Sequence, residues 1–392
     1  MTCRLCGYIL AHVLTTLTNA PRDYAWGSRT LIADLEGRPA TAGPEAEVWF
    51  GDHPSDPAEL ADGTALDAWT ARRGAEHGID GRLPYLMKIL AAASPLSIQV
   101  HPSKTQAEEG YAREADLAPG AVRNYADDNH KPEMIVALSD RFEALSGLRY
   151  AEGSRRLLAS LGGAADDLIA KIPDDASLKA AVGWLLSGDA QESVDRIIRA
   201  LADARSTEFA STLANARRIA QAYPSDPGVV VALLMNHVIL RRGEGMFLRA
   251  GLLHAYVSGL GIEIMAASDN VLRGGLTPKH IDVDELMSVV DATPGPVPVV
   301  LPTSANGSSR GVELFPVPVS DFSLMRARVS NGADARVALT GVGIVLATEG
   351  EVTVAQGDAS VVLAPGRAAL ATPDDLLALS GTGTVFVAQP GV

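Results

Sequence analysis

The sequence has 392 residues, of which 47% are hydrophobic and 20% charged. This composition is typical of a globular protein, and the length predicts more than one domain because single cores stop growing at about 250 to 300 residues. The formal net charge of −14 argues against a nucleic-acid-binding protein, which needs a basic face. It does not exclude an anionic small substrate, because a pocket can be positive on a negative surface.

The first residues carry the two cysteines of the chain, Cys3 and Cys6. A structural zinc site usually takes four ligands from two such pairs, so a single Cys-x-x-Cys pair predicts reduced thiols instead. The apolar stretch that follows is too short and too interrupted for a membrane span. We interpret residues 1–17 as an N-terminal extension and expect a cytoplasmic protein that does not cross a membrane.

The residue composition and hydrophobic pattern of the chain change twice after this extension. Residues 18–148 have short apolar runs separated by Gly, Pro and Asp, which predicts β-strands joined by turns. Residues 149–240 are rich in Ala and Leu and predict helices, because Val194, Ile197, Ile198 and Leu201 follow the spacing of one helix face. In 241–295 the sequence pattern again predicts β-strands. We therefore expect a helical insertion domain between two parts of one β domain.

The tail, 296–392, predicts a second β domain. It follows a linker rich in Pro, Thr, Ser and Gly, and it alternates short apolar runs with turn residues. One turn is predicted at Gly350, between the apolar runs 342–347 and 352–354. The tail contains no histidine, so we expect no metal site there. The fold class predicted is mainly β with an α-helical insertion.

A first chemical motif lies at Ser97-Ile98-Gln99-Val100-His101-Pro102. Alternate residues of a strand point to one face, so Gln99 and His101 are expected to face a common metal, with Ser97 further along that face. Pro102 cannot donate to a strand ladder, so we expect the strand to end there.

Two further motifs lie far along the chain. Glu133 precedes the apolar run 134–138 and is expected at the start of a strand, and His254 follows the helical block. Taken singly, such residues are more often structural or exposed than metal ligands. Their spacing alone does not join them into one site.

Several segments together resemble type I mannose-6-phosphate isomerase, a zinc enzyme of the cupin superfamily. The resemblance covers most of the β-rich sequence and rests on separate segments in the family's order, namely 22–28, 47–54, 83–90, 97–102, 129–134 and 245–282. It implies a cupin jelly-roll catalytic domain made of 18–148 and 241–295. It also implies a helical insertion domain at 149–240 and a C-terminal jelly-roll domain at 296–392.

The resemblance implies one zinc ion per chain, held by Gln99, His101, Glu133 and His254. Nitrogen and oxygen ligands with one carboxylate suit zinc. Four protein ligands make a closed tetrahedron, so two interpretations stay open. Zinc either expands its coordination shell and polarises substrate oxygens as a Lewis acid, or it mainly organises the site.

The activity that the resemblance implies is interconversion of mannose 6-phosphate and fructose 6-phosphate by proton transfer through an enediol. Such an enzyme supplies mannose 6-phosphate for GDP-mannose and glycan synthesis, or serves mannose catabolism. We expect a monomer without a nucleic-acid or membrane partner. Two alternatives remain: a non-catalytic cupin that binds a sugar phosphate, and an isomerase of another sugar phosphate.

This chemistry needs a base, stabilisation of an oxyanion and an anchor for phosphate. The matched segments supply Arg273, Lys131 and Glu263 as catalytic candidates; Glu263 lies in an apolar strand, where it must pair with a cation or act as an acid–base group. The expected substrate-binding residues are Ser97, Lys88, Lys279, Trp26 and Glu47. The identity of the base stays open.

Overall fold

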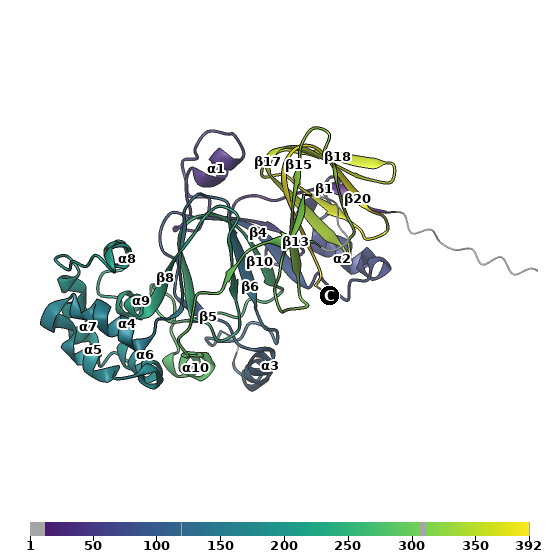
Figure 1. Cartoon of the computed structure of the whole chain (residues 1–392). Coiled ribbons are helices and arrows are strands. Elements are labelled where there is room, and N and C mark those ends of the chain that lie inside the picture. The colour runs from purple at the N-terminus through teal and green to yellow at the C-terminus, as the bar shows by residue number, and fades with distance from the viewer. Residues whose placement is uncertain (1–11, 119, 306–310, 392) are drawn as a thin grey trace, which may run out of the picture.

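The computed structural model describes residues 12–118, 120–305 and 311–391. Within these ranges the chain forms two antiparallel sheets of ten strands each, with a group of helices at one end (Figure 1). None of the helices in the described ranges is long and apolar enough to cross a membrane. The mainly β fold class with jelly-roll sheets is therefore confirmed. Cys3 and Cys6 lie outside the described residues.

The first sheet is organised around its long strand β10. Residues His254–Ser258 of β10 pair with β7, whereas Gly259–Ala266 pair with β4 and Gly261–Met265 pair with β6. The change of partner strands follows a register shift and occurs at Gly259. The φ of Gly259 is +126°, and a Cβ there would lie 2.8 Å from the Phe142 ring. The strands are β2 (Glu47–Phe50), β4 (Tyr85–Ala92), β5 (Gln99–Val100), β6 (Glu133–Ala137), β7 (Phe142–Leu148), β8 (Met235–Leu240), β9 (Gly245–Leu248), β10 (His254–Ala266), β11 (Leu272–Arg273) and β12 (Val299–Val300).

The second sheet combines the C-terminal tail with two strands from the N-terminal part of the chain. Strand β1 pairs with β19 and also with β3, so Leu14–Thr18 belong to this sheet. They span residue 17, where the N-terminal extension was predicted to end. Its strands are β1 (Leu14–Thr18), β3 (Glu59–Leu60), β13 (Thr303–Ser304), β14 (Val312–Phe315), β15 (Ser323–Val329), β16 (Ala335–Val337), β17 (Gly343–Gln356), β18 (Ala359–Leu363), β19 (Ala368–Ala371) and β20 (Leu377–Gln389).

The turn predicted at Gly350 is wrong, because β17 runs without interruption from Gly343 to Gln356. The strand shifts register against β20 between Ala347 and Glu349, and Gly350 follows with a φ of +65°. A Cβ at Gly350 would lie 2.0 Å from the Thr382 carbonyl oxygen. The glycine thus allows a bulge and a close backbone approach inside a strand, where the sequence pattern suggested a turn.

The helical insertion packs directly against the first sheet. Val194, Ile197 and Leu201 are buried as their spacing predicted, and one continuous core joins the helices to Val100 and Leu145. Its helices are α4 (Ala151–Ala159), η2 (Gly162–Ala165), α5 (Asp166–Lys171), η3 (Asp175–Ser177), α6 (Leu178–Leu186), α7 (Gln191–Ala200), α8 (Ala210–Ala222) and α9 (Gly228–Leu234). The remaining helices are α1 (Leu31–Leu35), α2 (Leu66–Arg73), η1 (Gly74–His77), α3 (Lys104–Arg113) and α10 (Val283–Val289).

Glu143 of β7 ties this insertion to the sheet. Its carboxylate accepts hydrogen bonds from Arg218 of α8, from Arg141 Nε at 2.6 Å and from His237 Nε2 of β8 at 3.2 Å. The hydrogen bond with His237, helped by the two arginines and opposed by burial, lowers the pKa of Glu143 to about 2.

Replacing this carboxylate by Glu143→Gln is expected to lower the free energy of unfolding by about 1 to 2 kcal/mol at pH 7, after allowance for solvent screening. A depressed carboxylate pKa stabilises the fold above the unfolded pKa near 4.5. The difference between variant and parent should therefore shrink as the pH falls from about 4.5 towards 2. Urea unfolding at several pH values measures it, with the exposed Glu192→Gln as the matched control. A difference that does not change with pH would contradict the prediction.

Candidate metal centre and substrate pocket

Three side chains that could hold a metal ion meet at one end of the first sheet. His101 follows β5, Glu133 begins β6 and His254 begins β10, and their ligand atoms lie within 4.8 Å of one another. The Nε2 atoms of His101 and His254 lie 3.4 and 3.5 Å from the Glu133 carboxylate oxygens. All three residues are buried. Strand pairing thus brings together residues that the sequence separates widely.

Both histidines are oriented by backbone carbonyl groups. His101 Nδ1 lies 2.7 Å from the Asn270 carbonyl oxygen, and His254 Nδ1 lies 2.9 Å from the Leu252 carbonyl oxygen. Because a carbonyl only accepts, each Nδ1 carries the proton, which leaves the Nε2 lone pair facing Glu133. Burial, opposed by Glu133, lowers the pKa of His101 to about 4, so its imidazole is neutral at pH 7, as a metal ligand must be.

The remaining donors complete a set that fits zinc. Burial would raise the pKa of Glu133, but the Lys131 ammonium holds it well below its usual value, so the carboxylate is ionised. Gln99 lies opposite His254, and its amide nitrogen donates to Ser97 Oγ at 3.2 Å, which leaves the amide oxygen as a donor for the metal. The buried His101 Nε2 has no hydrogen-bond partner among the described residues. A bound cation would satisfy that atom.

A pocket of about 620 Å³ opens beside this cluster. Eleven of the twelve residues predicted for the site line it, while His101 lies buried behind it. The lining includes four cations: Lys88, Lys131, Arg273 and Lys279. The structure therefore brings the predicted residues together, and their individual roles stay predictions.

Strand register places three of the pocket residues in one row. Lys88 of β4 lies between Trp49 of β2 and Glu263 of β10 in the pairing of the three strands. Lys88 Nζ lies 3.2 Å from Glu263, 3.7 Å from Glu47 and 4.8 Å from the Trp49 ring centroid. The Trp49 indole nitrogen donates to Glu47 at 2.7 Å. Glu263 thus has the cationic partner that its buried position required.

The other cations are held differently. Lys131 Nζ lies 2.9 Å from Glu133 Oε1, although Lys131 precedes β6 and is not part of the strand. Arg273 pairs with Gln99 between β11 and β5, is half-buried, and has no ion-pair partner within the described ranges. Burial lowers the pKa of Arg273 from its usual value. Lys279 likewise has no ion-pair partner among the described residues, but it is exposed, so Arg273 is the half-buried cation of the pocket that no carboxylate neutralises.

Several lining residues were missed by the sequence reasoning: Tyr24, Trp49, Tyr223, Tyr256 and Asp269. Trp49 could have been found, because it lies two residues from Glu47 on a strand and so shares its face. Asp269 gave no such signal. It is held by His53 Nε2 at 3.0 Å, and this hydrogen bond lowers the pKa of Asp269.

The helical insertion contributes one wall of the pocket. Tyr223 follows α8, lines the pocket and donates its hydroxyl proton to the Pro95 carbonyl at 2.9 Å. The first residue of α9, Gly228, packs on the segment that leads to Lys279, because a Cβ on Gly228 would lie 2.7 Å from the Leu276 nitrogen. These contacts make the end of the helical insertion part of the pocket wall.

A buried His–Glu–His set with an adjacent amide lies at the end of a jelly-roll sheet, beside a cation-lined pocket. This arrangement is a candidate metal centre in a fold of the cupin type. Residues 14–151 match the family model described as phosphomannose isomerase type I, catalytic domain. The chain is 36% identical to mannose-6-phosphate isomerase from Salmonella typhimurium over 386 residues, which covers 94% of this chain and 97% of that protein. Its human counterpart is 32% identical over 381 residues, covering 86% and 87% of the two chains.

Solved structures give the same assignment. A glutamate-to-alanine variant of phosphomannose isomerase from Salmonella typhimurium superposes with a TM-score of 0.89 at 32% identity, covering 97% of this chain and 100% of that one. A mannose 6-phosphate isomerase bound with zinc and yttrium superposes with a TM-score of 0.87 at 32% identity and the same coverage. The chain belongs to the type I mannose-6-phosphate isomerase family of enzymes.

Proposed function

We propose that this enzyme interconverts mannose 6-phosphate and fructose 6-phosphate with one zinc ion held by Gln99, His101, Glu133 and His254. One observation supports the proposal most: the candidate metal-ligand set opens onto a pocket of about 620 Å³, and this pocket also contains Arg273, which has no ion-pair partner in the part of the chain that the structure describes. A hexose phosphate needs both a polar site for its hydroxyl and carbonyl oxygens and a cation for its charge. The names of the similar enzymes support the choice of substrate.

Each residue group has a distinct task in the proposed reaction. When bound, zinc supplies Lewis-acid polarisation of sugar oxygens or organises the residues around them. Arg273 offers a fork of donors to the phosphate or to the enediolate, and Lys279 at the exposed rim adds positive charge. Trp26, stacked on Tyr24 with ring centroids 5.7 Å apart, forms an apolar wall of the pocket.

Two groups remain as acid–base candidates for moving the proton between C1 and C2. Burial raises the pKa of Glu263, Lys88 opposes this, and Glu133 and Glu47 raise it further. A carboxylate with a raised pKa is a better proton acceptor at neutral pH. Lys131, beside Glu133, is the second candidate and also offers a cation to a substrate oxygen. In a cell, this activity would connect fructose 6-phosphate with GDP-mannose and glycan synthesis or with mannose catabolism.

Metal removal tests the proposal directly. Formation of fructose 6-phosphate from mannose 6-phosphate should fall by at least about 100-fold after chelation and return on addition of zinc, because the metal contributes several kcal/mol to transition-state stabilisation. A coupled assay measures turnover and elemental analysis measures zinc. Full activity in metal-free protein would contradict the zinc-dependent mechanism.

A panel of phosphorylated aldoses separates the two alternatives from the proposal. Turnover confined to mannose 6-phosphate supports it, and faster turnover of another aldose phosphate assigns the enzyme to that substrate. Binding of mannose 6-phosphate to zinc-loaded protein without any product would favour a non-catalytic sugar-phosphate-binding cupin.

A further inference from the structure

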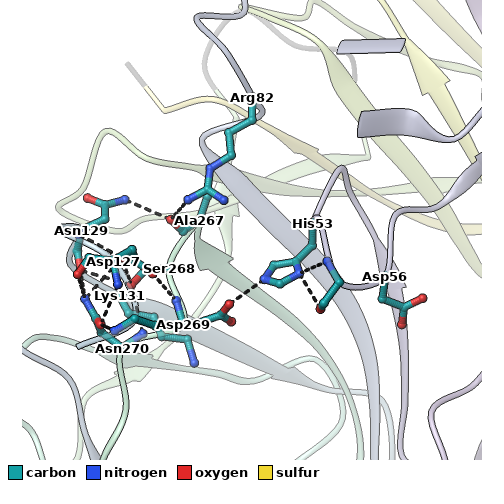
Figure 2. Close-up of polar contacts among 12 residues, drawn as sticks. His53, Asp56, Arg82, Asp127, Asn129, Lys131, Ala267, Ser268, Asp269 and Asn270 are labelled. Atoms are coloured by element: carbon teal, nitrogen blue, oxygen red, sulfur yellow. Dashed lines mark hydrogen bonds and ion pairs between the residues drawn. The ribbon is translucent and has the colours of Figure 1, made fainter. Parts of the chain in front are cut away.

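Two loops that connect to the strands of the metal centre are joined to each other by one asparagine, Asn270. The first loop, 126–131, leads into Glu133, and the second, 267–271, leads from β10 into Arg273. The Asn270 amide oxygen accepts from the Ala126 nitrogen at 2.8 Å, and its amide nitrogen donates to the carbonyl oxygens of Asp127 and Asn129, both at 2.8 Å (Figure 2). Asn270 is 1% exposed, so its amide group depends on these bonds and not on water for its partners.

Asp127 fastens the same two loops from the opposite side. One oxygen of its carboxylate accepts from Ser268 Oγ at 2.8 Å and from the Asn129 nitrogen at 2.9 Å, and the other accepts from the Asp269 nitrogen at 2.8 Å. Ser268 is 2% exposed. Figure 2 shows these bonds as one connected cluster between the loops. Because its two central side chains, Asn270 and Ser268, are buried and hydrogen-bonded to both loops, the network holds the loops in one geometry.

This network ends on a metal ligand. The backbone carbonyl of Asn270 accepts the Nδ1 proton of His101 at 2.7 Å, across 169 positions of sequence. The side chain of Asn270 therefore fixes the carbonyl that decides which nitrogen of His101 carries the proton and where its Nε2 points. No other hydrogen bond to the His101 ring occurs among the described residues.

We propose that Asp127 and Asn270 are positioning residues of the metal centre, and that together they set its affinity for zinc. They act through the Asn270 carbonyl, which holds His101 in the tautomer and orientation that direct Nε2 to the metal. Partners of this kind, outside the ligand set, typically change metal affinity about 10- to 100-fold. The inference rests on the proposed function only for the identity of the metal.

Zinc affinity of the full-length protein, measured by competition with a chelator, tests the inference without any activity assay. Asn270→Ala and Asp127→Ala should each weaken zinc binding by about 10- to 100-fold. Asp127→Asn, which keeps the shape and one acceptor, should recover part of that loss. Nitrogen NMR of labelled histidine in the metal-free protein should show the His101 Nδ1–H tautomer in the parent and a mixture of tautomers in Asn270→Ala.

Gln356→Ala is the matched control for a general loss of stability. Gln356 is 1% exposed and its amide also bridges two backbone carbonyls, of Thr372 at 2.6 Å and Asp375 at 3.0 Å, but it lies in the second sheet. We expect it to lower thermal stability and to leave zinc affinity unchanged. An equal loss of zinc affinity in this control would overturn the positioning role.

Parent-like zinc affinity in folded Asn270→Ala and Asp127→Ala would also overturn the inference. If either alanine variant fails to fold, Asp127→Asn decides: a zinc affinity about 3-fold or more below that of the parent supports the role, and an unchanged affinity rejects it. A parent that binds zinc tightly yet forms no fructose 6-phosphate contradicts the proposed function alone. An active parent whose variants keep full zinc affinity contradicts this inference alone.

Discussion

Arg273→Ala is expected to reduce kcat for isomerisation by about 100- to 1,000-fold while leaving the zinc content unchanged. Arg273 is half-buried, lines the pocket and has no carboxylate partner in the described part of the chain, so its charge is available to the substrate. Its backbone pairs with that of Gln99 between β11 and β5. Steady-state kinetics and elemental analysis of the same preparation measure both quantities.

Arg273→Lys keeps the charge but not the planar fork of donors, so it should recover only part of the lost turnover. Arg72→Ala is the matched control, because the Arg72 guanidinium is exposed and bonds only to the Ala68 carbonyl within α2. Loss of zinc from Arg273→Ala would show that the arginine supports the metal centre instead of the substrate.

Lys88→Met is expected to lower the free energy of unfolding by about 3 to 5 kcal/mol at pH 8. Lys88 is 6% exposed and lies between the carboxylates of Glu263 and Glu47, which are 3% and 6% exposed. Its loss therefore leaves two buried carboxylates without a cationic partner. The loss should be largest well above the unfolded carboxylate pKa. It should shrink as the pH falls, because the raised pKa of Glu263 lets that group become neutral in the folded state.

A second substitution separates charge from packing. Lys88→Met combined with Glu263→Gln should regain much of the lost stability. The single variant leaves two buried carboxylates without their cation, whereas the double variant leaves only one. Unfolding by urea at pH 8 and pH 5 measures both proteins. Equal stability losses in the single and double variants would show that lost packing, and not the unpaired carboxylate, explains the effect.

Local sequence patterns predicted a large part of the site. Alternation in a strand predicted that Gln99 and His101 face one site, and the structure places Gln99 in the pocket and His101 against the same cluster. The apolar run after Glu133 correctly predicted a strand start there. Burial of Glu263 in an apolar strand required a cation or a chemical role, and Lys88 at 3.2 Å supplies the cation.

Other features depend on contacts that no local pattern contains. The row of Trp49, Lys88 and Glu263 exists because of the register between β2, β4 and β10, and a shift by one residue would turn Lys88 to the opposite face. The bulge at Gly350 depends on the neighbouring strand, so an isolated glycine in the sequence suggested a turn instead.

The sequence by itself determined the mainly β class, the helical insertion and the neighbouring faces of Gln99 and His101, because these follow from periodicities of two and 3.6 residues along the chain. Resemblance to a family, and not spacing, joined Glu133 and His254 to them. Only the tertiary structure decided what orients each ligand. The Nδ1 proton of His101 faces the Asn270 carbonyl, across 169 positions of sequence. This contact forms only when β10 pairs with β5 and the loops 126–131 and 267–271 are joined by hydrogen bonds.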